Sequence, residues 1–246
     1  MKKILLMLAM MLPMAMFTAC SKDDEEKESV DTTPISLLVD DTHRIEMNIT
    51  PSKVSSENNF VASIDENGVV EGNHVGNTNV SINDKYTIPV EVKGNYHLYD
   101  DPVTEWGCST SYIKENQKQG SLKTEDSDAI VYENCGNAEM ITYLFENGKL
   151  NGVGVILNSS YTDEVALHLK ERYMFITETN NVIMGVNSYK KELATTIATI
   201  TLSDNLRYWV VIYMPYNYNA ANLKSKALND KRYVLINNIV EKLGLH

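Results

Sequence analysis

The feature that most restricts the fold of this chain is an alternation of apolar and polar residues, in short runs, between residues 35 and 92. Side chains alternate between the two faces of a β-strand, so a period of two predicts strands with one buried face. Turn residues such as Asn67-Gly68 and Gly76-Asn77 separate the runs. The predicted strands are 35–39, 44–49, 60–64, 69–70, 78–82 and 86–92. Many short strands at this spacing are typical of a small all-β sandwich.

Residues 61–72 read VASIDENGVVEG, and residues 76–82 read GNTNVSI. These segments resemble the signature of the bacterial Ig-like group 2 family: Val-Ala, then Asp-x-x-Gly-x-Val-x-Gly, then Gly-Thr before Ile or Val. Asn77, between the glycine and the threonine, is a small departure from that signature. The resemblance implies an all-β Ig-like sandwich (BIG2-like) over residues 34–93, in which Asn67-Gly68 supplies a tight hairpin.

The pattern changes after a linker at residues 94–101. Ser109 is a typical N-cap for a helix over 110–117, and the spacing of apolar residues predicts a second helix over 161–172. Further strands are predicted at 129–135, 140–146, 150–157, 182–186, 194–202 and 206–214, followed by a helical tail at 233–245. This order predicts an α+β two-layer sandwich over residues 99–246, with helices on one face of an antiparallel sheet.

Two other features of the second half concern its structure. Trp106-Gly107 and the YLFENGKL of residues 143–150 are similar in pattern to domains that follow Ig-like modules in surface lipoproteins of the Bacteroidota. Cys108 and Cys135 lie near a predicted helix start and strand end. They could form a disulfide outside the cytoplasm, or both could be buried thiols.

The first residues have the pattern of a secretion signal. Lys2 and Lys3 precede an apolar run at 4–16, which is too short to span a bilayer and ends just ahead of Cys20. The stretch resembles the lipobox of bacterial lipoproteins. That resemblance implies removal of a signal peptide at residues 1–19 and acylation of Cys20 by diacylglycerol and a further chain such as palmitate. Residues 20–33 are then expected to form a lipidated, flexible tether.

Short motifs within this tether suggest where the protein is located. Lys22-Asp23-Asp24 resembles the export signal of Bacteroidota surface lipoproteins, which implies an outer-membrane, cell-surface location. The alternative is that these charges only hydrate a spacer. Thr32 lies in a sequence, Asp-Thr-Thr, that resembles the O-glycosylation acceptor of the same bacteria, and a glycan on Thr32 is therefore expected.

The charge of the chain restricts its partners. The formal net charge is −11 at pH 7, and loss of Lys2 and Lys3 with the signal makes the mature protein more acidic. Repulsion from phosphate groups argues against nucleic acid and against electrostatic binding to anionic headgroups. The expected partners are the membrane, through the acyl chains, and an extracellular protein or glycan.

No motif in the sequence predicts catalysis. The histidines lack metal-ligand spacing, and no nucleophile elbow, phosphate-binding glycine loop or carboxylate pair stands out. The histidines are His43, His74, His97, His168 and His246. We therefore expect no catalytic residue, no metal and no cofactor.

An aromatic stretch at residues 208–218 is the most suggestive of ligand binding. Trp209, Tyr213 and Tyr216 could stack on a sugar ring, or the stretch could be a central core strand with aromatic residues at its end. Two functions follow from these observations. One is a non-enzymatic Ig-like spacer or adhesion module that presents the α+β domain to an extracellular partner. The other is a carbohydrate-binding or processing accessory of a surface glycan-utilisation system.

Overall fold

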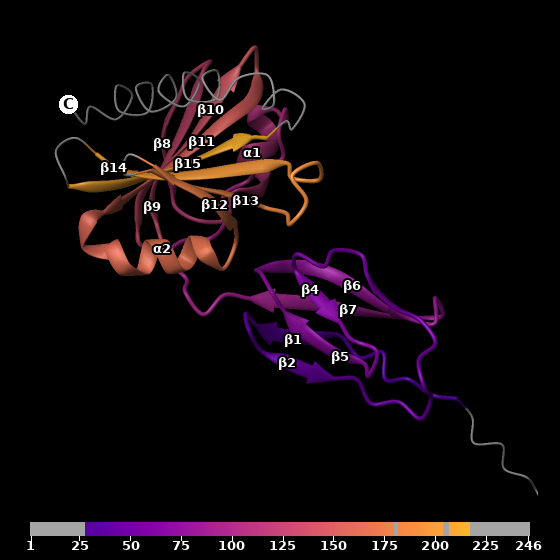
Figure 1. The fold of residues 1–246 in the computed structure, drawn as a ribbon. Coiled ribbons are helices and arrows are strands. Elements are labelled where there is room, and N and C mark those ends of the chain that lie inside the picture. Colours follow the sequence, from indigo (N-terminus) through magenta and orange to yellow (C-terminus); the bar gives the residue numbers. More distant parts are fainter. Residues whose placement is uncertain (1–27, 180–181, 204–206, 217–246) are drawn as a thin grey trace, which may run out of the picture.

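The computed structural model describes residues 28–179, 182–203 and 207–216, which form two β-sheet regions and two short α-helices (Figure 1). The first region contains a four-stranded and a three-stranded sheet, and the second is a single eight-stranded antiparallel sheet. Among these residues no helix is long and apolar enough to cross a membrane. The expected helical tail at 233–245 lies outside the described residues.

The first unit buries a core between its two sheets. The larger sheet has the order β1 (Ile35–Leu38), β7 (Tyr86–Lys93), β6 (Gly76–Ile82), β3 (Val54–Ser56), and the smaller has β2 (Thr42–Arg44), β5 (Val69–Gly72), β4 (Ala62–Ile64). Val70 from the smaller sheet and Val80 and Ile88 from the larger are fully buried in one cluster. The predicted alternation therefore places one face of each sheet in a shared core.

The predicted hairpin at Asn67-Gly68 is confirmed. Strands β4 and β5 pair antiparallel across it, and Gly68 has a φ of 73°, which favours glycine. The Asp65 carboxylate accepts hydrogen bonds from the backbone N–H groups of Asn67 (2.9 Å) and Val69 (2.8 Å). The turn is thus fixed by its own side chains.

Two expectations for the first unit differ from the structure. The strand predicted at 44–49 is only Thr42–Arg44, and the chain beyond it pairs with the segment expected to be tether: Met47 forms a bridge with Val30. Val30 packs against the core of the unit, so the ordered fold begins before residue 33. Strand β3 was not predicted because its three residues include two serines and lie at a sheet edge.

The second unit is built on the eight-stranded sheet. Its strands are, in spatial order, β12 (Met174–Thr179), β13 (Val182–Val186), β14 (Thr196–Leu202), β15 (Tyr208–Pro215), β11 (Lys149–Asn158), β10 (Ala138–Glu146), β9 (Ala129–Cys135) and β8 (Ser121–Glu125). The helices are α1 (Thr110–Asn116) and α2 (Thr162–Lys170), and a 3-10 turn (Ser159–Tyr161) precedes α2. Ser109 accepts from the N–H of Tyr112 and caps α1 as predicted.

Both faces of this sheet are apolar. Ile113 of α1 and Leu169 of α2 belong to the same buried cluster as Ile141 and Val211, so both helices cover one face, as expected. The opposite face carries a second buried cluster, which includes Ile212. The edge strands β8 and β12 were not predicted; every residue of β8 is exposed and therefore gives no period-two signal.

Candidate functional site

The junction between the two units is a densely hydrogen-bonded polar region. Residues 94–101 were expected to be an exposed linker, but Leu98 is 5% exposed and Tyr99 is completely buried. The Tyr99 hydroxyl lies 2.7 Å from that of Tyr213, which is also buried, on β15. The linker therefore belongs to the core of the second unit and not to a flexible spacer.

Glu171, which follows α2 in the second unit, bonds to both the linker and the first unit. Its carboxylate accepts hydrogen bonds from the backbone N–H groups of Asn95 (2.9 Å) and Tyr96 (3.0 Å). Its backbone carbonyl accepts from the N–H of Val75 in the first unit (2.8 Å). One residue thus bonds to both sides of the junction.

Arg172 fixes the next part of the linker. Its side chain is 7% exposed, and its Nε donates to the Asp101 carboxylate at 2.6 Å. Its Nη1 donates to the carbonyl oxygens of His168 (3.0 Å) and Tyr96 (3.3 Å). These charge-assisted bonds fix the linker at Tyr96 and at Asp101.

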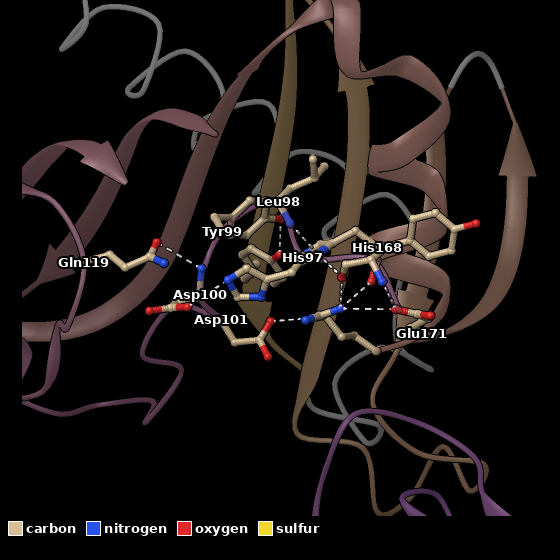
Figure 2. Close-up of polar contacts among 11 residues, drawn as sticks. His97, Leu98, Tyr99, Asp100, Asp101, Gln119, His168 and Glu171 are labelled. Carbon is tan, nitrogen blue, oxygen red and sulfur yellow. Dashed lines mark hydrogen bonds and ion pairs between the residues drawn. The ribbon is translucent and has the colours of Figure 1, made fainter. Parts of the chain in front are cut away.

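His168 of α2 is fully buried beneath the linker. Its Nδ1 lies 3.1 Å from the Tyr96 carbonyl oxygen, and its ring packs at 4.5 Å from the ring of Tyr99 (Figure 2). Burial lowers the pKa of His168 to about 3, and the positive charge of Arg172 acts in the same direction. The imidazole is therefore neutral at physiological pH, and its Nε2 has no hydrogen-bond partner within the described residues.

A second contact between the units is aromatic. The ring of Phe60 stacks on that of His74 with centroids 3.8 Å apart, and Tyr189 of the second unit packs edge-on against Phe60 at 5.0 Å. The Nδ1 of His74 lies 2.9 Å from the Phe60 carbonyl oxygen and 3.5 Å from the Tyr189 hydroxyl. Burial lowers the pKa of His74, so this cluster is also uncharged at neutral pH.

Two hollows open at the junction. The larger, of about 1010 Å³, has a polar lining that includes Glu91, Asp101 and Arg172. The other, of about 720 Å³, is lined by several aromatic rings, among them those of Tyr96 and Tyr189. We call the second hollow the aromatic groove; its complete lining is Val39, Asp40, Asn73, His74, Asn95, Tyr96, Leu167, Lys170, Glu171, Tyr173, Met174, Phe175 and Tyr189.

The predicted stacking residues do not form one site, which corrects that prediction. Tyr213 is 1% exposed in the core that α1 and α2 cover, so its ring is inaccessible to a ligand. Trp209 packs against the same core and donates from Nε1 to the Thr162 hydroxyl (3.1 Å). Tyr216 packs against the cluster on the opposite face of the sheet. Trp209 and Tyr213 therefore share one face of the strand, as the period of two predicts, and Tyr216, after the strand end, lies on the other.

The cysteines are separate thiols, so the disulfide alternative is not the observed state. Cys135 is fully buried, and burial raises its pKa to about 11. Cys108 is partly exposed, and its pKa is also raised, chiefly by burial. Their side chains contribute to the core of the second unit as small apolar groups.

Of the predicted modification sites only Thr32 lies in the described chain. It is exposed, and the preceding Asp31 carboxylate accepts from both the N–H (2.9 Å) and the hydroxyl (2.6 Å) of Thr33. This leaves the Thr32 side chain accessible next to an ordered turn. Cys20 and the Lys22-Asp23-Asp24 segment lie outside the described residues.

Sequence reasoning missed the residues that build the junction. Glu171 and Arg172 read as ordinary charges at the end of a helix, since their partners lie about 70 or more residues earlier in the chain. No group of three or more His, Cys, Asp or Glu side chains suited to a metal ion occurs among the described residues.

No protein-family model matches this chain, and no curated protein matches it in sequence. The fold and the junction define a two-unit β-rich protein with a linker built into the second unit.

Proposed function

We propose that this chain is a lipid-anchored cell-surface protein without enzymatic activity. In this proposal Cys20 carries the acyl chains, the Ig-like sandwich acts as a spacer, and the α+β domain is presented to an extracellular partner. The resemblances at Cys20 and at Lys22-Asp23-Asp24 support the anchor and the outer-membrane location. The two facing sheets of the first unit, together with its resemblance to the Ig-like group 2 signature, support the sandwich.

The single observation that carries the spacer role is where the chain enters and leaves the first unit. Strand β7 runs from Tyr86 to Lys93 and continues into the linker, while Lys85 at its start lies 3.4 Å from Glu28. The described chain therefore begins at the end of the unit opposite to the linker (Figure 1). At about 3.3 Å per residue, β7 alone separates the two ends by roughly 25 Å.

The bonds at the junction support presentation in a fixed orientation. Glu171 bonds to both Val75 and the linker, and Tyr189 packs against Phe60 from a separate segment. Two contacts at different places oppose hinge motion more strongly than a single one. The buried groups Glu171, Arg172 and His168 are occupied by backbone partners, which supports a structural role for them over a catalytic one.

Metabolic labelling tests the lipid anchor, and digestion of intact cells with protease tests the cell-surface location. Wild-type cells should incorporate a palmitate analogue into this protein, and Cys20→Ser should abolish the label and leave an uncleaved precursor. Replacing Lys22, Asp23 and Asp24 with alanine should keep the label but make the protein resistant to protease added to intact cells.

The sequence offers a matched control for the export signal. Glu25, Glu26 and Lys27 carry the same set of charges immediately after it, and their replacement with alanine should leave surface digestion unchanged. If the two triple variants are digested alike, the charges act only as a hydrated spacer, and the proposed export signal is refuted. A Cys20→Ser variant that still takes up the label would refute the anchor.

A further inference from the structure

The aromatic groove holds an unusual share of the exposed apolar surface. Four of its lining side chains are large, apolar and substantially exposed: Tyr96 (38%), Leu167 (36%), Phe175 (38%) and Tyr189 (49%). Contiguous apolar patches on a monomer are frequently functional, whereas single exposed residues are not informative. The groove of about 720 Å³ is within the range that accommodates a small ligand.

Contacts within the protein hold the backbone of Tyr96 and the rings of Phe175 and Tyr189 in place before any ligand binds. The backbone of Tyr96 is bonded through its N–H to Glu171 and through its carbonyl to Arg172. Phe175 is seated on β12 against Gly185, where a Cβ would lie only 3.0 Å from the Phe175 ring. Tyr189 is braced by the Phe60 and His74 rings. Ligand binding therefore orders few side chains.

Three charged side chains line the same groove: Glu171, whose carboxylate is bonded to the linker, and two further groups of opposite sign, Asp40 and Lys170. Neither the Asp40 carboxylate nor the Lys170 ammonium forms a hydrogen bond or ion pair with another described residue. Asp40 is also fixed in position, because its N–H donates to the Gly72 carbonyl (2.7 Å) and its φ is 69°. The groove thus offers an acceptor and a donor that are free of partners within the described residues, beside exposed aromatic faces.

We propose that the aromatic groove binds an uncharged oligosaccharide. Sugar rings have apolar C–H faces that pack on aromatic rings, and their hydroxyls both donate and accept hydrogen bonds. The opposite charges of Asp40 and Lys170 give the groove no side that favours an anion or a cation throughout, and each group can form a hydrogen bond with a sugar hydroxyl. A volume of about 720 Å³ is that of a small-ligand site. A stable protein partner, by contrast, covers about 800 Å² of surface on each side. This inference goes beyond the proposed spacer role, since it assigns a ligand to the junction itself.

The test uses the full-length lipidated protein purified in detergent. It is applied to an array of maltoheptaose, cellohexaose, xylohexaose, mannohexaose and host-type N- and O-glycans, and the dissociation constant of the best ligand is then measured by calorimetry. Phe175→Ala and Tyr189→Ala should each weaken binding about tenfold, since an aromatic contact is worth roughly one such factor. Asp40→Asn, which tolerates the same backbone angle, and Lys170→Gln should each weaken it about fivefold.

Tyr112→Ala is the matched control, because Tyr112 is 40% exposed on α1 and lies outside the aromatic groove. It should leave the dissociation constant unchanged. Trp209→Ala should also have no effect; a loss of binding there but not at Phe175 or Tyr189 would place the site elsewhere and overturn the proposal. So would the absence of binding to any arrayed glycan at millimolar concentration, or binding of peptides alone. Metabolic labelling at Cys20 and surface digestion are independent of all these outcomes, so the proposed surface role and the groove can fail separately.

Discussion

Replacing Glu171 with alanine should lower the free energy of unfolding by about 2–4 kcal/mol, because two partly buried backbone N–H groups lose their acceptor. Those groups belong to Asn95 and Tyr96, and the Glu171 side chain that they contact is 9% exposed. The substitution also removes a carboxylate 3.9 Å from Arg172 and leaves that buried guanidinium less compensated. Urea unfolding of wild type and variant at neutral pH measures the difference.

Two further variants distinguish the lost hydrogen bonds from a general effect of charge. Glu171→Gln keeps an acceptor oxygen and should recover about half of the loss. Glu91→Ala removes an exposed carboxylate from β7 and should change stability by less than about 0.5 kcal/mol. An unfolding free energy for Glu171→Ala within 0.5 kcal/mol of wild type would mean that the linker does not depend on this anchor.

Acidification should destabilise the protein through His168, with about 1.4 kcal/mol lost per pH unit between pH 6 and pH 4. The pKa of His168 is lowered in the folded state from 6.5 to about 3, so the unfolded chain takes up a proton first as the pH falls. The contribution is therefore fully present above pH 6.5 and is lost progressively down to about pH 3. His74, whose pKa burial also lowers, adds to the same trend.

The variant His168→Asn isolates this contribution. Its amide can occupy the place of Nδ1 and donate to the Tyr96 carbonyl, but it does not titrate. The slope of unfolding free energy against pH, measured between pH 6 and pH 4, should be shallower in the variant by about one proton. Carboxylates that titrate in this range affect both proteins alike. Equal slopes would show that His168 is accessible to protons in the folded state.

The sequence predicted most elements that a local apolar run or a helix cap defines. Strand β9 and strand β13 match their predicted bounds, and helix α1 begins directly after the predicted cap at Ser109. In each case a local pattern of burial or a cap determines the element. The strands that were missed, β3, β8 and β12, lie at sheet edges, where pairing on one side and exposure weaken the pattern.

The junction could not be predicted because its chemistry depends on distant pairs. Arg172 pairs with Asp101, 71 residues earlier, and Tyr189 reaches His74, 115 residues earlier. Neither pair has a spacing or a motif that would associate its members. The aromatic stretch produced the opposite error, a predicted site that is absent. Its many rings suggested a ligand-binding surface, but Tyr213 is part of the core.

The central claim is that the first unit holds the second in a fixed orientation, and a distance distribution between them tests it most directly. Spin labels can be placed at two exposed positions, Asp84 in the turn before β7 and Lys149 at the start of β11, after Cys108 and Cys135 have been replaced by serine and alanine. Pulsed electron double resonance should give one narrow distribution, which broadens in Glu171→Ala. A broad distribution in the protein that retains Glu171 would show that the units move independently, and would contradict both the rigid spacer and the preformed groove.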